Sequence, residues 1–280
     1  MTVSRGPLVL CARCGTGVTA APPIVADPRG YGTDRPRLAR AAAPLLALFD
    51  RQRLALLREV APAPGRLLDA GAGRGRFVAA ARAAGYDARG IEPSPGAAAQ
   101  GGPGVELGTI EDAVVEPSSL DAVALWHVLE HVDDPAAALG SVAGWLRPGS
   151  GLLIGVPNLA SFQAKLGGER WFHLDLARHR THFTPAGLRA LLERTGFAVE
   201  AERHVLAEHN PFGLWQTAVN RVTRTPSWLF NALQRNAPLW SRDALVTLLA
   251  LPLLPVAVVV ELAAGLARRG GTIAVVARRR

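Results

Sequence analysis

The hydrophobic positions of this chain alternate between short apolar runs and longer segments in which apolar side chains recur every three or four residues. Short runs bounded by glycine, proline or charged residues predict strands at 66–70, 87–92, 105–107, 122–126, 152–156 and 197–203. Helical spacing falls between them, at 37–60, 74–84, 135–146 and 185–194. Strands and helices alternating in this way predict a doubly wound α/β sheet.

Two segments lie outside this alternation. Residues 1–35 are rich in proline and glycine, and residues 205–268 are apolar with helical spacing. Residues 271–277 return to strand character before the arginines at the end of the sequence. We therefore expect a helical insertion ahead of one last strand.

Composition narrows the classes of protein that remain. Hydrophobic residues make up 49 % and charged residues 19 % of the 280 positions, which excludes a disordered chain and a coiled coil. The two cysteines cannot staple a secreted scaffold, and the apolar run 8–10 is too short for a signal peptide. We expect a reducing, cytoplasmic setting.

The net charge of +8 is unevenly distributed along the chain. Residues 1–157 hold 15 basic and 15 acidic side chains, whereas residues 158–280 hold 16 basic and 8 acidic ones. A single lysine, Lys165, stands among 31 basic residues, which indicates a compositional bias toward arginine. No basic run is interleaved with aromatic residues as a stacking surface would require, so we expect no nucleic-acid partner.

A glycine-rich turn follows the strand at 66–70. Its sequence, Asp69-Ala-Gly71-Ala-Gly73-Arg-Gly75, lets the backbone turn tightly and approach a ligand at the start of the next helix. The spacing differs from the G-x-G-x-x-G of a dinucleotide site because position 76 is arginine. Glu92 ends the next strand, where a carboxylate can accept two hydrogen bonds from a ribose diol.

Together with three further segments, these motifs resemble the class I S-adenosylmethionine-dependent methyltransferases. The segments are Gly108-Thr-Ile110-Glu111-Asp112, the run 121–135 containing Trp126-His127-Val-Leu-Glu130-His131-Val-Asp-Asp-Pro, and Leu146-Arg-Pro-Gly149. The resemblance covers about residues 66–205. It implies a Rossmann-like sheet of seven strands and S-adenosylmethionine as cofactor. The residues it assigns to the cofactor are Asp69, Gly71, Gly73, Gly75, Glu92, Pro93, Ile110, Glu111, Trp126 and His127.

The resemblance also sets the expected organisation and activity. We expect an N-terminal segment at 1–35, a methyltransferase core at 36–204, an apolar helical insertion or lid at 205–268 and a final core strand at 269–280. The expected reaction is O-methylation of a small-molecule, glycan or lipid-linked acceptor. The alternative is a non-catalytic module that keeps the cofactor fold and docks on a membrane or protein partner.

His127, Glu130 and His131 allow several interpretations. As a bare pattern, H-x-x-E-H is the signature of inverted zinc peptidases, but here it directly follows a strand rather than lying within a long helix. Within a methyltransferase, His127 or His131 can act as general base. Some similar quinone-type O-methyltransferases bind a divalent metal near this motif, which Glu130 and His131 match. A purely structural role for these side chains is the third alternative.

A second group of histidines follows the strand at 152–156. His179 and His182 lie on the loop before the helix at 185–194, and loops at this end of an open α/β sheet carry substrate chemistry. We predict them as catalytic bases, with loop orientation as the alternative. His173 belongs equally well to the surface.

The segments 1–35 and 205–268, which flank the predicted core, each suggest a further function. Cys11 and Cys14 form half of a zinc site and, with Pro28 and Tyr31, resemble the second half of a zinc ribbon, but a free thiol pair is the alternative. Residues 244–260 carry no charge, yet Pro252 and Pro255 interrupt them. They are expected to roof the substrate site, to contact a membrane peripherally, or to span it.

Overall fold

The computed structural model describes residues 2–5, 8–20, 41–234, 236–238 and 240–280. The chain divides into two compact units. The first, called here the sheet unit, comprises residues 47–156, 185–202 and 274–280. The second, called the helical unit, comprises residues 1–46, 157–184 and 203–273. Each unit is described by itself.

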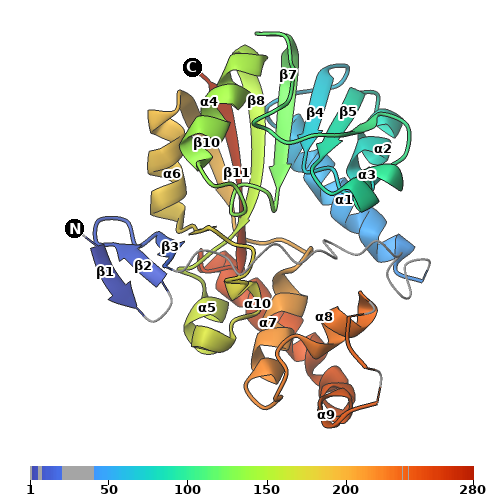
Figure 1. The fold of residues 1–280 in the computed structure, drawn as a ribbon, viewed down its shortest axis with the longest axis vertical. Helices are drawn as coiled ribbons and strands as arrows, with labels where there is room; N and C mark the ends of the chain where they lie inside the picture. The colour runs from blue at the N-terminus through green and yellow to red at the C-terminus, as the bar shows by residue number, and fades with distance from the viewer. Residues whose placement is uncertain (1, 6–7, 21–40, 235, 239) are drawn as a thin grey trace. The chain divides into compact units, whose positions relative to one another are not determined.

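The sheet unit is built on seven strands in the order β10-β11-β8-β7-β4-β5-β6 (Figure 1). Their bounds are β4 (Arg66–Ala70), β5 (Asp87–Glu92), β6 (Val105–Leu107), β7 (Leu120–Trp126), β8 (Leu146–Pro157), β10 (Phe197–Arg203) and β11 (Thr272–Arg279). Strands β6, β5, β4, β7 and β8 pair in parallel, each with the next. Because parallel strands end at the same edge, the residues that follow β4, β5, β6 and β7 are brought together.

Helices cover the faces of this sheet. They are α1 (Ala43–Arg58), α2 (Arg76–Ala83), α3 (Pro95–Ala99), α4 (Pro135–Trp145) and α6 (Pro185–Arg194). The strands carry apolar runs rather than an alternating pattern since both sheet faces are buried. Leu67, Leu68, Leu125 and Ile154 are accordingly fully buried.

In its described residues, the helical unit combines a small sheet with five α-helices. Strands β1 (Thr2–Arg5), β2 (Leu8–Cys11), β3 (Gly17–Thr19) and β9 (Thr181–His182) form a sheet in that order. The helices are α5 (Phe162–Gly167), α7 (Asn210–Asn220), α8 (Trp228–Leu233), α9 (Arg242–Ala250) and α10 (Leu254–Leu266). Leu214, Trp215 and Val219 of α7 pack against Ala257 of α10.

The predicted seven-stranded α/β sheet and its C-terminal apolar helices are confirmed. The expectation that His182 lies on the loop before the helix at 185–194 is wrong, because His182 belongs to the strand β9. The small sheet was not foreseen, since β3 pairs with a strand about 160 residues away in sequence. Residues 37–40 of the first predicted helix, together with Pro28 and Tyr31, lie outside the described residues.

Candidate functional site

The turn after β4 has the conformation that its glycines allow. Gly71, Gly73 and Gly75 have φ angles of 82°, 55° and 74°, in the left-handed region that disfavours residues with a Cβ. A Cβ on Gly71 would overlap Val128, and one on Gly75 would lie 2.7 Å from Val105. A Cβ on Gly73 would meet no heavy atom within 4 Å. The middle glycine therefore borders open space, as a loop that receives a ligand requires.

Glu92 ties this turn to the end of β5. Its Oε2 accepts a hydrogen bond from the Gly73 backbone N–H at 2.8 Å, and its Oε1 accepts one from the Ser94 N–H at 2.9 Å. The side chain is buried. The carboxylate is thus fixed beside the open middle of the turn, and each oxygen keeps a second lone pair for a ligand hydroxyl.

Asp69, the first residue of the motif, is buried at the end of β4. Desolvation raises the pKa of its carboxyl to about 7, although the Arg53 guanidinium opposes the shift and the Glu92 carboxylate adds to it. The side chain therefore titrates near neutral pH. A bound cation would favour its ionised form.

Sequence reasoning missed the contribution of α1 to this region. The guanidinium of Arg53 lies 4.7 Å from the ring centroid of Trp126 and 5.6 Å from that of Phe77. Asp50, one turn earlier, pairs with Arg76 at 2.9 Å. The available signal was a pair of charged residues three positions apart on an amphipathic helix, which is common on any solvated face.

His127 follows β7 directly and has a positive φ of 56°, which is uncommon for a residue other than glycine. Its Nδ1 lies 3.1 Å from Oε1 of the buried Glu130. If Nδ1 carries the proton and donates it to this carboxylate, Nε2 is the basic nitrogen of the ring. A histidine oriented by a carboxylate is an arrangement suited to accepting a proton.

The remaining predicted cofactor residues lie at the same edge of the sheet. Pro93 is exposed directly after β5, and Trp126 is the buried last residue of β7. Beyond β6, Ile110 is buried whereas Glu111 is exposed. Ligands of open α/β sheets bind at the carboxyl ends of the strands, next to the point where the strand order reverses. Here that point lies between β4 and β7.

His179 and His182 belong to the helical unit and are both buried. Nδ1 of His179 contacts the carbonyl oxygen of His173 at 2.9 Å, and Nε2 of His182 lies 3.1 Å from the Thr19 hydroxyl. The two rings are 5.9 Å apart between centroids. The contact of His182 with Thr19 joins β9 to β3. A catalytic role for either histidine stays a prediction.

The Cys11–Cys14 pair lies on the turn between β2 and β3. The turn is closed by hydrogen bonds from the Gly15 N–H to the Cys11 carbonyl and from the Cys11 N–H to the Thr16 carbonyl, both 2.8 Å. Backbone N–H groups, first that of Cys14 and then that of Arg13, lower the pKa of the Cys11 thiol. Zinc binding by this pair stays a prediction.

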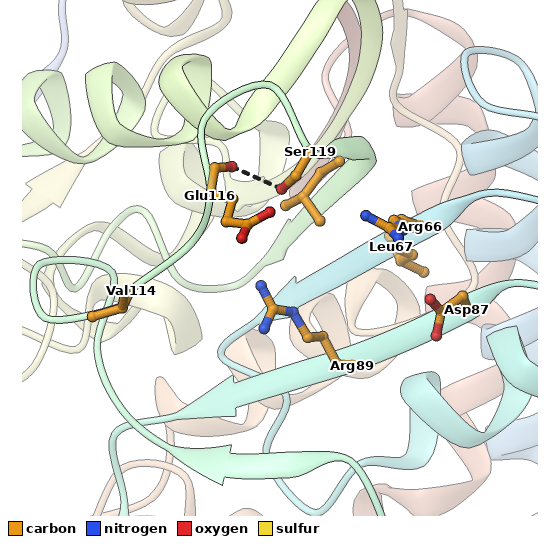
Figure 2. Close-up of a pocket in the computed structure, with 8 residues that line it drawn as sticks. Arg66, Leu67, Asp87, Arg89, Val114, Glu116 and Ser119 are labelled. Carbon is orange, nitrogen blue, oxygen red and sulfur yellow. Dashed lines mark hydrogen bonds between the residues drawn. The ribbon is translucent and has the colours of Figure 1, made fainter.

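The sheet unit has a cavity of about 370 Å³, and Figure 2 shows the side chains that line it. Arg66, Asp87 and Leu120 line it, and these are the first residues of β4, β5 and β7. Ser119 also lines it and donates a hydrogen bond to the Glu116 carbonyl. The cavity therefore lies at the amino ends of the strands and is separate from the glycine turn.

A Rossmann-like sheet with a glycine turn after one strand and an acid closing the next defines a site for a nucleoside-containing cofactor. A family model described as a methyltransferase domain matches residues 37–202, and the chain belongs to that family. It has the class I fold that is shared by S-adenosylmethionine-dependent methyltransferases. The open middle of the turn and the fixed Glu92 carboxylate fit that cofactor.

Curated relatives match parts of the chain. A ubiquinone biosynthesis O-methyltransferase of Xylella fastidiosa is 37 % identical over 98 residues, which are 32 % of this chain and 40 % of that protein. One from Xanthomonas axonopodis pv. citri is 28 % identical over 180 residues, covering 59 % of this chain and 73 % of the relative. The chain thus spans about two fifths of the length of the Xylella protein.

Solved structures share the fold. A S-adenosylmethionine-dependent methyltransferase from Archaeoglobus fulgidus has a TM-score of 0.54 at 17 % identity, covering 84 % of this chain and 94 % of that one. A geranyl diphosphate C-methyltransferase from Streptomyces coelicolor has a TM-score of 0.53 at 15 % identity, covering 86 % and 83 %. The fold therefore accommodates methylation of different atoms, and the atom methylated here must be argued from the site.

Proposed function

We propose that this protein transfers the methyl group of S-adenosylmethionine to a hydroxyl oxygen of a small molecule. The observation that carries the proposal is the pair of His127 and Glu130, 3.1 Å apart at the carboxyl end of β7. A neutral hydroxyl is a weak nucleophile and must lose its proton as it is methylated, whereas a thiolate or a neutral amine is nucleophilic without help from a base. The names of the curated O-methyltransferase relatives support the same atom.

The reaction needs little else from the protein. The bound cofactor supplies an activated methyl group, so that most of the rate comes from holding donor and acceptor in line. The glycine turn at Gly73 would hold the methionine part of the cofactor, and Glu92 would hold the ribose of its nucleoside part. His127 would take the hydroxyl proton on Nε2, while Glu130 stabilises the imidazolium that results.

A panel of labelled methyl-transfer assays tests the proposal. The protein is incubated with methyl-labelled S-adenosylmethionine and phenols, catechols, aliphatic alcohols, amines and thiols, and the labelled atom is located by NMR. We expect methyl ethers of a phenol or catechol. Labelling confined to nitrogen, sulfur or carbon would overturn the proposal.

The role of His127 is tested with the same acceptor. His127→Asn is expected to lower kcat by about 10²–10⁴-fold, since general base catalysis contributes that much. Glu130→Gln should cost less and should shift the pH profile of kcat, because it changes how the imidazole is held. Calorimetric titration with S-adenosylhomocysteine measures cofactor binding separately from kcat in both variants.

Unchanged kcat in His127→Asn would remove the base from the mechanism. A chelator separates the two chemical roles that the motif allows. Activity that survives EDTA supports His127 as base, while activity that EDTA abolishes and Mg²⁺ restores would instead assign Glu130 and His131 to a metal.

A further inference from the structure

The last two helices of the helical unit carry many exposed apolar side chains. Helix α9, the short turn at 251–253 and α10 follow one another, and their most exposed aliphatic side chains are Leu245, Leu249, Leu253, Val256, Val259 and Leu266. We call these six side chains the apolar face. Exposed apolar surface on this scale marks an interaction site rather than ordinary surface.

The other side of α10 is bound to its own unit. Ala257, Glu261 and Gly265 recur every four residues and are buried. Oε1 of Glu261 accepts a hydrogen bond from the Gly271 N–H at 2.7 Å, and Ala257 packs on α7. Residues 242–266 are long and apolar enough to cross a bilayer, with 17 % of the most apolar window buried. Crossing would break the Glu261 contact, so the geometry favours a helix pair that lies flat.

In the stretch of chain that carries the apolar face, the exposed charged side chains are basic. Between residues 203 and 273 the acidic residues are Glu208, Asp243 and Glu261, and all three are buried. Arg242 and Arg269, at the two ends of the helix pair, are exposed. An apolar surface bordered by exposed arginines complements a bilayer that contains anionic lipids.

Trp240 adds an aromatic anchor. It precedes α9 and is 94 % exposed, whereas the other five tryptophans of the chain are buried. An exposed tryptophan beside an apolar helix is typical of the boundary between lipid headgroups and acyl chains.

We propose that α9 and α10 dock in the plane of an anionic membrane, with the apolar face in the acyl boundary and Trp240 at the level of the headgroups. The arginines at the helix ends contact lipid phosphates. The proposal concerns binding alone and does not depend on which acceptor is methylated.

Trp240 allows a test on the unaltered protein. Vesicles of phosphatidylcholine with phosphatidylglycerol should shift its fluorescence to the blue, and brominated acyl chains should quench it. Trp240→Phe identifies the responding residue.

Vesicles of phosphatidylcholine alone should bind more weakly, and salt should weaken binding to the anionic vesicles. Arg242→Gln with Arg269→Gln should lower that binding roughly fivefold per arginine.

Co-sedimentation then locates the surface. The double variant Leu249→Glu/Val259→Glu should lose vesicle binding, while Val114→Glu, a change at an aliphatic side chain 95 % exposed in the sheet unit, should retain it. All three positions are exposed, so the variants should keep the thermal midpoint of the parent. No binding and no Trp240 shift would overturn the proposal. A dimer in light scattering that only the double variant dissociates, without vesicle binding, would overturn it in favour of a second copy.

Discussion

The Glu92 carboxylate accepts hydrogen bonds from two separate backbone segments. Its oxygens accept hydrogen bonds from Gly73 and Ser94, which lie after different strands. Those N–H groups would lose their acceptor in Glu92→Ala, and a ribose diol would lose its partner as well. We expect the affinity for S-adenosylmethionine to fall by about 10–100-fold, the cost of one charge-assisted hydrogen bond or two.

Calorimetric titration with S-adenosylmethionine and S-adenosylhomocysteine measures this change. Glu106→Ala is the matched control, because Glu106 is an exposed acid on the neighbouring strand β6. Equal affinities for the parent and a folded Glu92→Ala protein would remove Glu92 from the cofactor site.

At the scale of elements, two glycines of the turn after β4 have different roles. Gly71 is packed against Val128, whereas Gly73 borders open space. Gly71→Ala combines a strained φ with a clash against Val128, whereas Gly73→Ala meets only the strained φ. We expect Gly73→Ala to lose about 1–2 kcal/mol of unfolding free energy. Gly71→Ala should lose distinctly more. Urea denaturation of both variants measures the difference.

The Gly73→Ala change should also affect the affinity for the cofactor. Gly73→Ala places its methyl group in the open space beside the turn and is expected to weaken S-adenosylmethionine binding more than its loss of stability suggests. A folded Gly73→Ala protein with unchanged affinity would show that the cofactor does not approach this residue.

The sequence was most informative about these same elements. The alternation of apolar runs with helical spacing predicts β4, β5 and β6 at the bounds observed, because each run is local and is closed by a glycine, a proline or a charge. The strand β8 begins six residues earlier than expected, since the Leu146-Arg-Pro-Gly stretch that opens it has no apolar periodicity. The pairing of β3 with β9 depends on residues far apart in the chain, and local patterns carry no information on such contacts.

The site shows the same division. The sequence correctly predicts that the glycines follow β4 and that Glu92 ends β5, because both positions are local to a strand end. The contact between Glu92 and the Gly73 N–H, the Arg53 guanidinium over Trp126, and the pairing of His127 with Glu130 are tertiary geometry. Residue types alone left base, metal and structural roles open for His127, and the observed 3.1 Å contact is what favours the base.

For the whole molecule, two buried acids make contributions of the same sign to the pH dependence of stability. The pKa of Asp69 is raised to about 7 by desolvation, and desolvation also raises the pKa of Glu261. In the unfolded chain both groups release their protons near pH 4. Between about pH 4 and 7 the folded protein therefore binds more protons than the unfolded chain, and its stability falls as the pH rises.

The raised pKa of Asp69 predicts that Asp69→Asn increases the free energy of unfolding at alkaline pH. An uncharged amide avoids the burial of a carboxylate, so the variant should be more stable than the parent at pH 8, by at most about 4 kcal/mol. Its stability should fall less steeply between pH 4 and 7, with the slope that remains coming from Glu261. Urea denaturation across this range measures both quantities, with Asp87→Asn as an exposed control. A parent stability that rises through the window, or an equal slope in Asp69→Asn, would show that Asp69 is ionised in the folded protein throughout.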